Sequence, residues 1–270
     1  MSGEGKNFVT TNSWQSLRQL TAARIALGRA GISIPTAPHL EFQLAHARAR
    51  NAVHHVLDVE LLKTAAEGLS LKLIELNSAA VSRAEYLQRP DKGRMLSAAS
   101  RDELIPIVAG QTAACDVAIV IGDGLSAFAV EKNAGALLQV VVPLIRASGW
   151  SIAPATVVRN ARVAIGDEIA HALGAQALVV LIGERPGLSS PDSLGIYMTY
   201  APRPGLTDES RNCISNVRVE GLSYDEAAHK LMYLMTEAFK RRQSGVLLKD
   251  EAETLSVSAP LNRTVPLALK

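Results

Sequence analysis

Two carboxylates are the residues best placed for ligand chemistry, because each follows a short apolar run and a glycine. Asp123 comes after the run at 116–121, and Glu184 comes after the run at 177–182. Both runs are apolar and rich in β-branched residues, which is typical of strands buried on both faces of a parallel sheet. The carboxyl ends of such strands form the ligand crevice of open α/β sheets. The sequence therefore indicates where a ligand binds before it indicates which ligand.

Glu184 has two interpretations of equal weight. Its carboxylate can accept hydrogen bonds from ribose hydroxyls or from an amide group of a ligand. Alternatively, it forms a local ion pair with Arg185 or Arg203.

The triplet Gly122-Asp123-Gly124 could bring backbone N–H groups close to a phosphate at a helix N-terminus. We favour a tight strand-to-helix turn that requires glycine, by about two to one. The dinucleotide fingerprint lacks its third glycine, since position 127 is Ala127, and no P-loop lysine–hydroxyl pair is present. A nicotinamide nucleotide is therefore a poor prediction for the ligand.

Cys213 is either a reactive thiol, a contact residue or a buried apolar filler, and the filler is the commoner role of a lone cysteine. Cys115 enters a buried strand and is expected to be only a filler.

The sequence contains no His-Glu-x-x-His pair and no Gly-x-Ser-x-Gly elbow. The histidines, none of which belongs to such a pair, are His39, His46, His54, His55, His171 and His229. We therefore predict a ligand crevice without catalytic residues or metal ligands, so the chemistry comes from a cofactor or occurs on another chain.

Composition limits the class of protein. The 270 residues are 48% hydrophobic and carry a net charge of +2, which argues against a general nucleic-acid binder. Two distant cysteines form neither a disulfide framework nor a zinc-site spacing. We see no secretory signal and no apolar run of membrane-spanning length, so we expect a cytoplasmic protein.

The elements that must position these residues alternate between strand and helix from residue 100 to residue 182. This alternation predicts an α/β fold with a doubly wound, mainly parallel sheet and helices on both faces. The long segment 183–215 carries one possible strand, and a loop of this length is usually functional. The expected strands cover 116–121, 155–158, 177–182 and 196–200, and the expected helices cover 125–147 and 165–173.

The N-terminal third reads as helical. Capping boxes are predicted at Ser100 with Glu103 and at Ser223 with Glu226, the second opening a long helix. We divide the chain into a helical docking arm at 1–99 and a Rossmann-like ligand-binding domain at 100–270. The expected N-terminal helices run from Ser13 to Gly31, over 39–60 and over 61–76, with a short helix or turn at 83–88.

Several motifs together resemble the small subunit (light chain) of ethanolamine ammonia-lyase. The resemblance covers about residues 14–245, and its long loop motif is highly specific. The motifs are Thr-Ala-Ala-Arg-Ile-Ala-Leu-Gly-Arg (21–29), Ile-Gly-Asp-Gly-Leu-Ser (121–126), Leu-Ile-Gly-Glu-Arg-Pro-Gly-Leu (181–188), Asp-Ser-Leu-Gly (192–195) and Arg-Asn-Cys-Ile-Ser-Asn (211–216).

The resemblance implies a carbon–nitrogen lyase that converts ethanolamine to acetaldehyde and ammonia with adenosylcobalamin. It also implies a hetero-oligomer in which the large subunit holds the substrate and the radical chemistry. The small subunit then covers the cofactor's nucleotide side, and the family's contact positions correspond to Val163, Glu184 and Cys213. The sequence has no Asp-x-His-x-x-Gly motif, so we expect dimethylbenzimidazole to stay on the cobalt.

Two alternatives remain open from the residues: a stand-alone nucleotide-binding oxidoreductase and a non-enzymatic corrinoid-binding protein. Some members of the family carry a longer N-terminal extension that directs the enzyme to a bacterial microcompartment. Here the matching region begins near residue 14, so that address is in doubt. The segment 255–270 has no family counterpart that we can place.

Overall fold

The computed structural model describes residues 8–109 and 115–252, and it contains a six-stranded sheet in the order β1-β3-β2-β4-β5-β6. The first four strands of this order run parallel, while β5 and β6 are antiparallel to their neighbours. The predicted α/β fold with a mainly parallel sheet is confirmed. The strands are β1 (Leu73–Asn77), β2 (Cys115–Gly122), β3 (Ala155–Arg159), β4 (Ala175–Gly183), β5 (Leu194–Tyr200) and β6 (Arg211–Val217).

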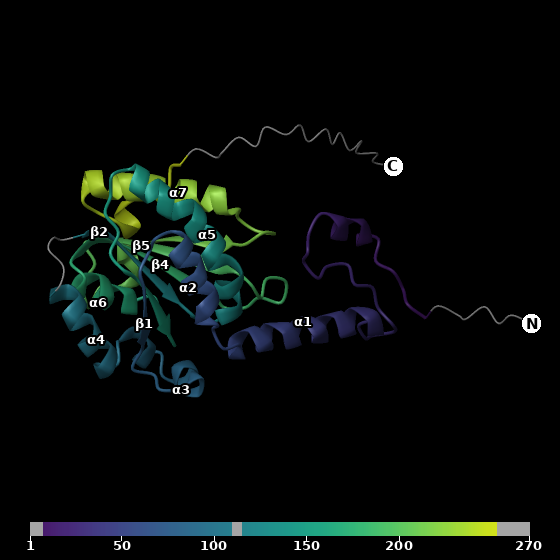
Figure 1. Ribbon diagram of the computed structural model, residues 1–270. Helices are drawn as coiled ribbons and strands as arrows, with labels where there is room; N and C mark the ends of the chain where they lie inside the picture. The colour runs from purple at the N-terminus through teal and green to yellow at the C-terminus, as the bar shows by residue number, and fades with distance from the viewer. Residues whose placement is uncertain (1–7, 110–114, 253–270) are drawn as a thin grey trace, which may run out of the picture.

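Helices cover both faces of the sheet, as Figure 1 shows. Helices α2, α5 and α7 pack on one face, and α4 and α6 pack on the other. Short 3₁₀ turns connect several of these elements. The helices are α1 (Thr36–His54), α2 (Val59–Gly68), α3 (Arg83–Gln88), α4 (Ala98–Ala109), α5 (Ala127–Ala147), α6 (Ile165–Ala172) and α7 (Tyr224–Arg241), and the turns are η1 (Gln15–Gln19), η2 (Lys92–Arg94), η3 (Asp208–Ser210) and η4 (Gly245–Leu247).

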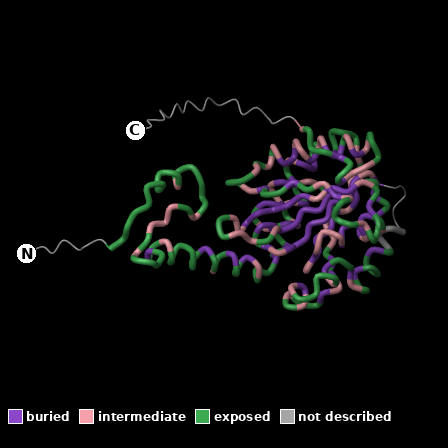
Figure 2. The backbone as a smooth tube through the Cα atoms, turned by 180° about the vertical axis from the view of Figure 1, so that it is seen from behind, coloured by how far each residue is buried: buried purple, intermediate pink, exposed green. Residues whose placement is uncertain are grey.

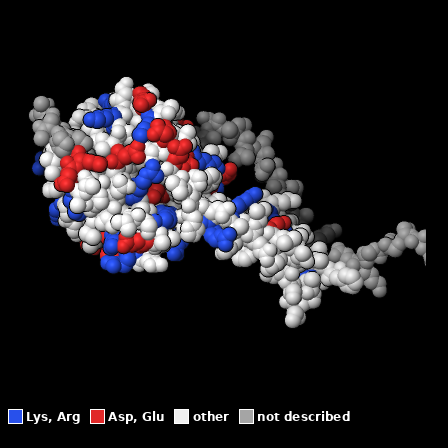
Figure 3. Space-filling model, turned by 60° about the horizontal axis from the view of Figure 1, so that its bottom comes forward, with Lys and Arg blue, Asp and Glu red and all other residues white. Residues whose placement is uncertain are grey.

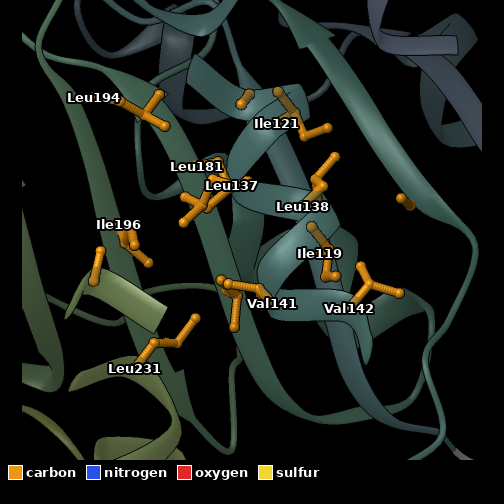
Figure 4. Packing of buried hydrophobic residues seen from close by; sticks show 14 of the residues in the cluster. Ile119, Ile121, Leu137, Leu138, Val141, Val142, Leu181, Leu194, Ile196 and Leu231 are labelled. Atoms are coloured by element: carbon orange, nitrogen blue, oxygen red, sulfur yellow. The ribbon is translucent and has the colours of Figure 1, made fainter. Parts of the chain in front are cut away.

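Helix α5 is the centre of the larger core cluster. Its apolar side chains face those of β2, β4 and β5, as Figure 4 shows for Leu138 beside Ile119 and Ile121 and for Leu137 beside Leu181. By length and composition, α5 is apolar enough to cross a membrane, contrary to our expectation for this chain. Half of the most apolar stretch of α5 is nevertheless buried within the protein, as expected for a core helix.

The expected helix from Ser13 to Gly31 is wrong, because only η1 is helical there. Thr10 and Arg29 instead form a β-bridge, and Gly28 has a left-handed φ of 74°. A Cβ at Gly28 would lie 2.7 Å from the carbonyl oxygen of Thr10. This close return of the backbone, invisible to helical periodicity, ends the helix early.

The next two expected helices, 39–60 and 61–76, are shifted. Helix α1 ends at His54, and α2 begins after Asp58, whose side chain accepts from the backbone N–H of Glu60. The chain then enters β1, which pairs with β3, so long-range pairing overrides local helix preference. The sheet thus takes one strand from before residue 99, the boundary we predicted between the two regions.

The first predicted capping box is also wrong in position. Ser100 lies inside α4, and its N–H donates to the side chain of Ser97 at 3.1 Å. The hydroxyl of Ser100 accepts from the backbone N–H of Asn77 and thereby ties α4 to β1. The second capping box is confirmed, with Ser223 and Glu226 capping each other at the start of α7.

Residues 8–54, which we call the arm, extend away from the compact part of the molecule. Helix α1 projects from it, and the preceding segment folds beside the far end of α1 (Figure 1). Most of the arm is exposed, whereas the sheet is buried (Figure 2).

Candidate functional site

The sheet leaves part of one face uncovered on β5 and β6. Side chains alternate along these strands, so Ile196 and Ile214 enter the core beneath α7. Tyr197 and Cys213 are paired in the register and point to the opposite side. Cys213 and Ser215 are exposed there, while α4 and α6 cover the other strands. We call this surface of Tyr197, Cys213 and Ser215 the open face.

Glu184 lies at the border of the open face and is held by three donors. Its Oε1 accepts from the hydroxyl of Ser215 at 2.5 Å. Its Oε2 accepts from the hydroxyl of Ser193 and from the backbone N–H of Asn216, the latter at 3.2 Å. A carboxylate offers about four acceptor positions, so one remains for a ligand donor. Glu184 forms no ion pair with Arg185 or Arg203 among the described residues, and contact with a ligand stays a prediction.

Gly195 leaves room for the side chain of Glu184 beside the sheet. A Cβ at this position would lie 3.1 Å from Oε1 of Glu184 and 3.3 Å from Cε2 of Tyr197. Both distances are shorter than ordinary van der Waals contact. Glycine at this position therefore lets the side chains of Glu184 and Tyr197 pack closely against β5.

Cys213 is exposed, so its interpretation as a buried filler is wrong. Desolvation of the sulfur beside Tyr197 raises the pKa of the Cys213 thiol, and the charge of Glu184 raises it further. The thiol is therefore neutral near pH 7 and behaves as a contact surface instead of a nucleophile. Cys115 is buried, and its thiol donates to the carbonyl oxygen of Leu173, which confirms its role as a filler.

Val163 lies just before α6 and packs against the same cluster of apolar residues as Tyr197. It therefore shares the side of the sheet with Cys213, and it follows β3 as Glu184 follows β4. A hydrogen bond from Ser215 joins Glu184 to β6, whereas Val163 is related to these residues only by its side of the sheet.

A buried ion pair supports the start of β6. The guanidinium of Arg211 donates to both carboxylate oxygens of Asp167, at 3.0 and 2.8 Å, and both side chains are only 1% exposed. Arg211 also donates to the carbonyl oxygen of Leu206 at 3.0 Å. This pair fastens β6 to α6, so the residues on either side of the open face keep a fixed separation.

The triplet at 122–124 forms a tight turn, as we favoured. The carboxylate of Asp123 accepts from the backbone N–H groups of Asn160 and Ala161, at 2.8 and 2.9 Å. Gly124 has a φ of 58°, and a Cβ there would lie 2.2 Å from the carbonyl oxygen of Gly183. Asp123 is therefore occupied by the protein itself, and its role is to join the ends of β2 and β3.

Sequence reasoning missed four residues of this site: Ser193, Tyr197, Ser215 and Asn216. Ser193, Ser215 and Asn216 lie within the motifs Asp-Ser-Leu-Gly and Arg-Asn-Cys-Ile-Ser-Asn. A strand prediction over β6 would have placed Cys213 and Ser215 on one face. Among the described residues, no group of three or more His, Cys, Asp or Glu residues is arranged to hold a metal ion.

Comparison with known proteins identifies the family. The family described as "Ethanolamine ammonia-lyase light chain (EutC)" matches residues 11–249. The chain belongs to this family. It is 55% identical to the ethanolamine ammonia-lyase small subunit of Xanthomonas campestris pv. campestris (strain B100) over 262 residues, which cover 94% of this chain and 96% of that protein.

Two other relatives of the ethanolamine ammonia-lyase light-chain family give the same result. The small subunit from Ralstonia nicotianae is 57% identical over 245 residues, or 91% of each chain. That from Pseudomonas aeruginosa (strain LESB58) is 53% identical over 253 residues, covering 94% of this chain and 93% of that one. The predicted resemblance is confirmed over nearly the whole chain, and it outweighs the oxidoreductase and carrier alternatives.

Proposed function

We propose that the open face holds the nucleotide side of adenosylcobalamin, with Val163, Glu184 and Cys213 as its contacts. The chain is the small subunit of ethanolamine ammonia-lyase, a carbon–nitrogen lyase, and it works in a complex with the large subunit. Adenosylcobalamin is the cofactor that the family implies. When bound, it supplies the radical chemistry by homolysis of its cobalt–carbon bond.

The side chains at the open face fit this cofactor chemically. Corrin rings carry amide side chains, and the acceptor position left on Glu184 suits an amide N–H. The exposed side chain of Cys213, paired with Tyr197 across β5 and β6, suits contact with a broad, mostly apolar ring edge. The observation that carries the proposal is the position of Glu184, whose carboxylate is fixed by Ser193, Ser215 and Asn216.

We expect a division of labour between the two subunits. Burial raises the pKa values of the Cys213 thiol and the Tyr197 hydroxyl, so both groups stay neutral and act in binding and positioning. Conversion of ethanolamine to acetaldehyde and ammonia then takes place on the side covered by the large subunit. The small subunit alone therefore has no lyase activity.

The predicted docking region covers residues 1–99, and the arm is the part of it that best fits a protein interface. The arm up to residue 44 carries 11 of the 22 large hydrophobic side chains that are exposed among the described residues. Figure 3 shows that the visible surface of the arm is mostly uncharged, in contrast to the compact part. Such an accumulation marks a protein interface, and we assign it to the large subunit. The enzyme is further proposed to act in the cytoplasm or in a bacterial microcompartment.

The test is reconstitution. The small subunit is mixed with or without its large subunit, adenosylcobalamin and ethanolamine are added, and acetaldehyde is measured. Activity confined to the mixture supports the proposal. A stable complex without acetaldehyde would contradict the assigned reaction, and turnover of a nicotinamide by this chain alone would favour the oxidoreductase alternative.

A further inference from the structure

A cleft of about 710 Å³ lies where the arm meets the compact part of the molecule. Its walls come from α1, α5, the loop before β5 and the segment after β6, and Ala22 of the arm closes one side. The guanidinium of Arg24 donates to the carbonyl oxygen of Leu188 at 3.4 Å, which joins the arm to that loop. We call this space the arm cleft.

The charges in the arm cleft are unbalanced. Lys132 pairs with Asp192, and Arg218 lies 3.4 Å from the carboxylates of both Asp192 and Glu220. Arg48 also lines the cleft, is exposed and has no ion-pair or hydrogen-bond partner among the residues that the structure describes. Three basic side chains therefore face two acidic ones, and the uncompensated charge is that of Arg48.

The arm cleft is also partly apolar and continuous with the apolar surface of the arm. Phe128 lines it and remains 38% exposed. Leu44, which is 53% exposed, lies one helical turn before Arg48, on the same stripe of α1. An occupant of the cleft therefore gains apolar contact at Phe128 and Leu44 and an opposite charge at Arg48.

We propose that the arm cleft receives a carboxylate-bearing segment of the large subunit, whose acidic side chain pairs with Arg48. This inference rests on the proposed function, because it takes the large subunit as the partner. The apolar contacts at Phe128 and Leu44 exclude water from the pair, and a partly desolvated charge pair is stronger than an exposed one. The volume of the cleft is in the range that accommodates several inserted side chains.

The arm cleft is adjacent to the segment that borders the open face. Asp192 is buried and is held by Lys132 and Arg218 in the cleft, while its neighbour Ser193 donates to Glu184. An occupant of the cleft thus stabilises the same short segment that fixes the Glu184 carboxylate. We therefore expect docking in the cleft to strengthen cofactor binding as well as assembly.

The first experiment measures the affinity of the full-length small subunit for the large subunit by titration calorimetry. Arg48→Glu is expected to raise the dissociation constant by about tenfold or more, as charge reversal at a close interfacial pair does. Arg50→Glu is the matched control, because Arg50 is exposed on the same helix, does not line the cleft and lies on another side of α1. Unchanged thermal unfolding of both variants shows that neither affects the fold.

The second experiment identifies the occupant. Phe128 is replaced by the photoreactive p-benzoylphenylalanine, the complex with the large subunit is irradiated, and the cross-linked peptides are sequenced. A cross-link to a segment of the large subunit that contains Asp or Glu supports the proposal. A cross-link to a second copy of the small subunit, or no cross-link to the large subunit in an active complex, overturns it.

The two proposals fail differently. If the wild-type mixture is active and Arg48→Glu binds the large subunit as tightly as Arg50→Glu does, the cleft proposal is overturned and the proposed function stands. If the wild-type mixture forms a complex but produces no acetaldehyde, the proposed function is the one that fails.

Discussion

Replacing Arg211 with methionine tests the buried ion pair that holds β6 beneath the open face. The wild-type guanidinium donates to both oxygens of Asp167, and neither side chain reaches solvent. Methionine retains an apolar stem of similar length but removes both donors. The carboxylate of Asp167 is then left buried without an opposite charge.

The expected loss of stability is large and depends on pH. Removing one partner of a buried pair costs about 3–5 kcal/mol, which corresponds to a fall in Tm of roughly 6–20 °C for a domain of this size. Burial already raises the pKa of Asp167 above its ordinary value, against the opposing effect of Arg211. Without Arg211 this pKa rises further, so the folded protein binds the proton more tightly than the unfolded chain does. The variant is therefore least destabilised at low pH and loses more stability as pH rises through the folded-state pKa of Asp167.

The assay is unfolding followed by circular dichroism at pH 5.5 and pH 8, with Arg203→Met as the control. Arg203 is exposed on the preceding loop and has no partner among the described residues, so its loss should change Tm little. A second variant, Asp167→Leu with Arg211→Met, removes both charges and should recover much of the loss. A loss below about 1 kcal/mol at pH 8 for Arg211→Met alone, or an equal loss at both pH values, would refute the reasoning.

Three further predictions concern the turn, the thiol and the cofactor. Gly124→Ala should destabilise the chain by about 2–4 kcal/mol in urea unfolding, because its Cβ meets the carbonyl oxygen of Gly183 and its φ is positive; a change under about 0.5 kcal/mol would contradict this. The alkylation rate of Cys213 by iodoacetamide should rise with pH around a midpoint above that of free cysteine, because burial raises the pKa of the thiol, and Glu184→Gln should lower that midpoint by removing a negative charge; a midpoint below that of free cysteine would contradict the neutral thiol. Electron spin resonance of the cob(II)alamin form in the complex should show coupling to the base nitrogen of dimethylbenzimidazole, whereas coupling to a protein histidine would be inconsistent with the sequence.

The central strands were predictable because their signal is local. Continuous β-branched runs ending in glycine gave β2 and β4 within two residues of their observed bounds. The capping box at Ser223 gave the start of α7 for the same reason. In each case the residues that decide the structure are neighbours in sequence.

The elements that sequence reasoning missed depend on distant partners. Strand β1 forms by pairing with β3, and β6 forms by pairing with β5. The turn at Gly28 depends on the returning backbone at Thr10. None of these partners is visible in a window of ten or so residues, which is the range over which periodicity acts.

The candidate site likewise combines a residue that local sequence indicates with residues that depend on distant segments. Glu184 stood out because it follows a buried strand, but its donors Ser193 and Ser215 come from two other segments. Cys213 was expected to be a filler because a lone cysteine usually is one. Only the alternation of β6 shows that it faces the open side of the sheet.

Cofactor affinity in the reconstituted complex tests the role of the open face most directly. Adenosylcobalamin is titrated into complexes that contain wild-type small subunit, Glu184→Ala or Glu67→Ala, and binding is followed by the change in the corrin absorption spectrum. Glu67 is exposed on α2, on the other side of the sheet. Loss of a hydrogen bond to a charged acceptor costs about 1.5–3 kcal/mol, so Glu184→Ala should raise the dissociation constant by roughly tenfold to 150-fold and leave turnover at saturation largely intact. An unchanged dissociation constant for Glu184→Ala, or an equal rise for Glu67→Ala, would contradict the assignment of the cofactor to this face.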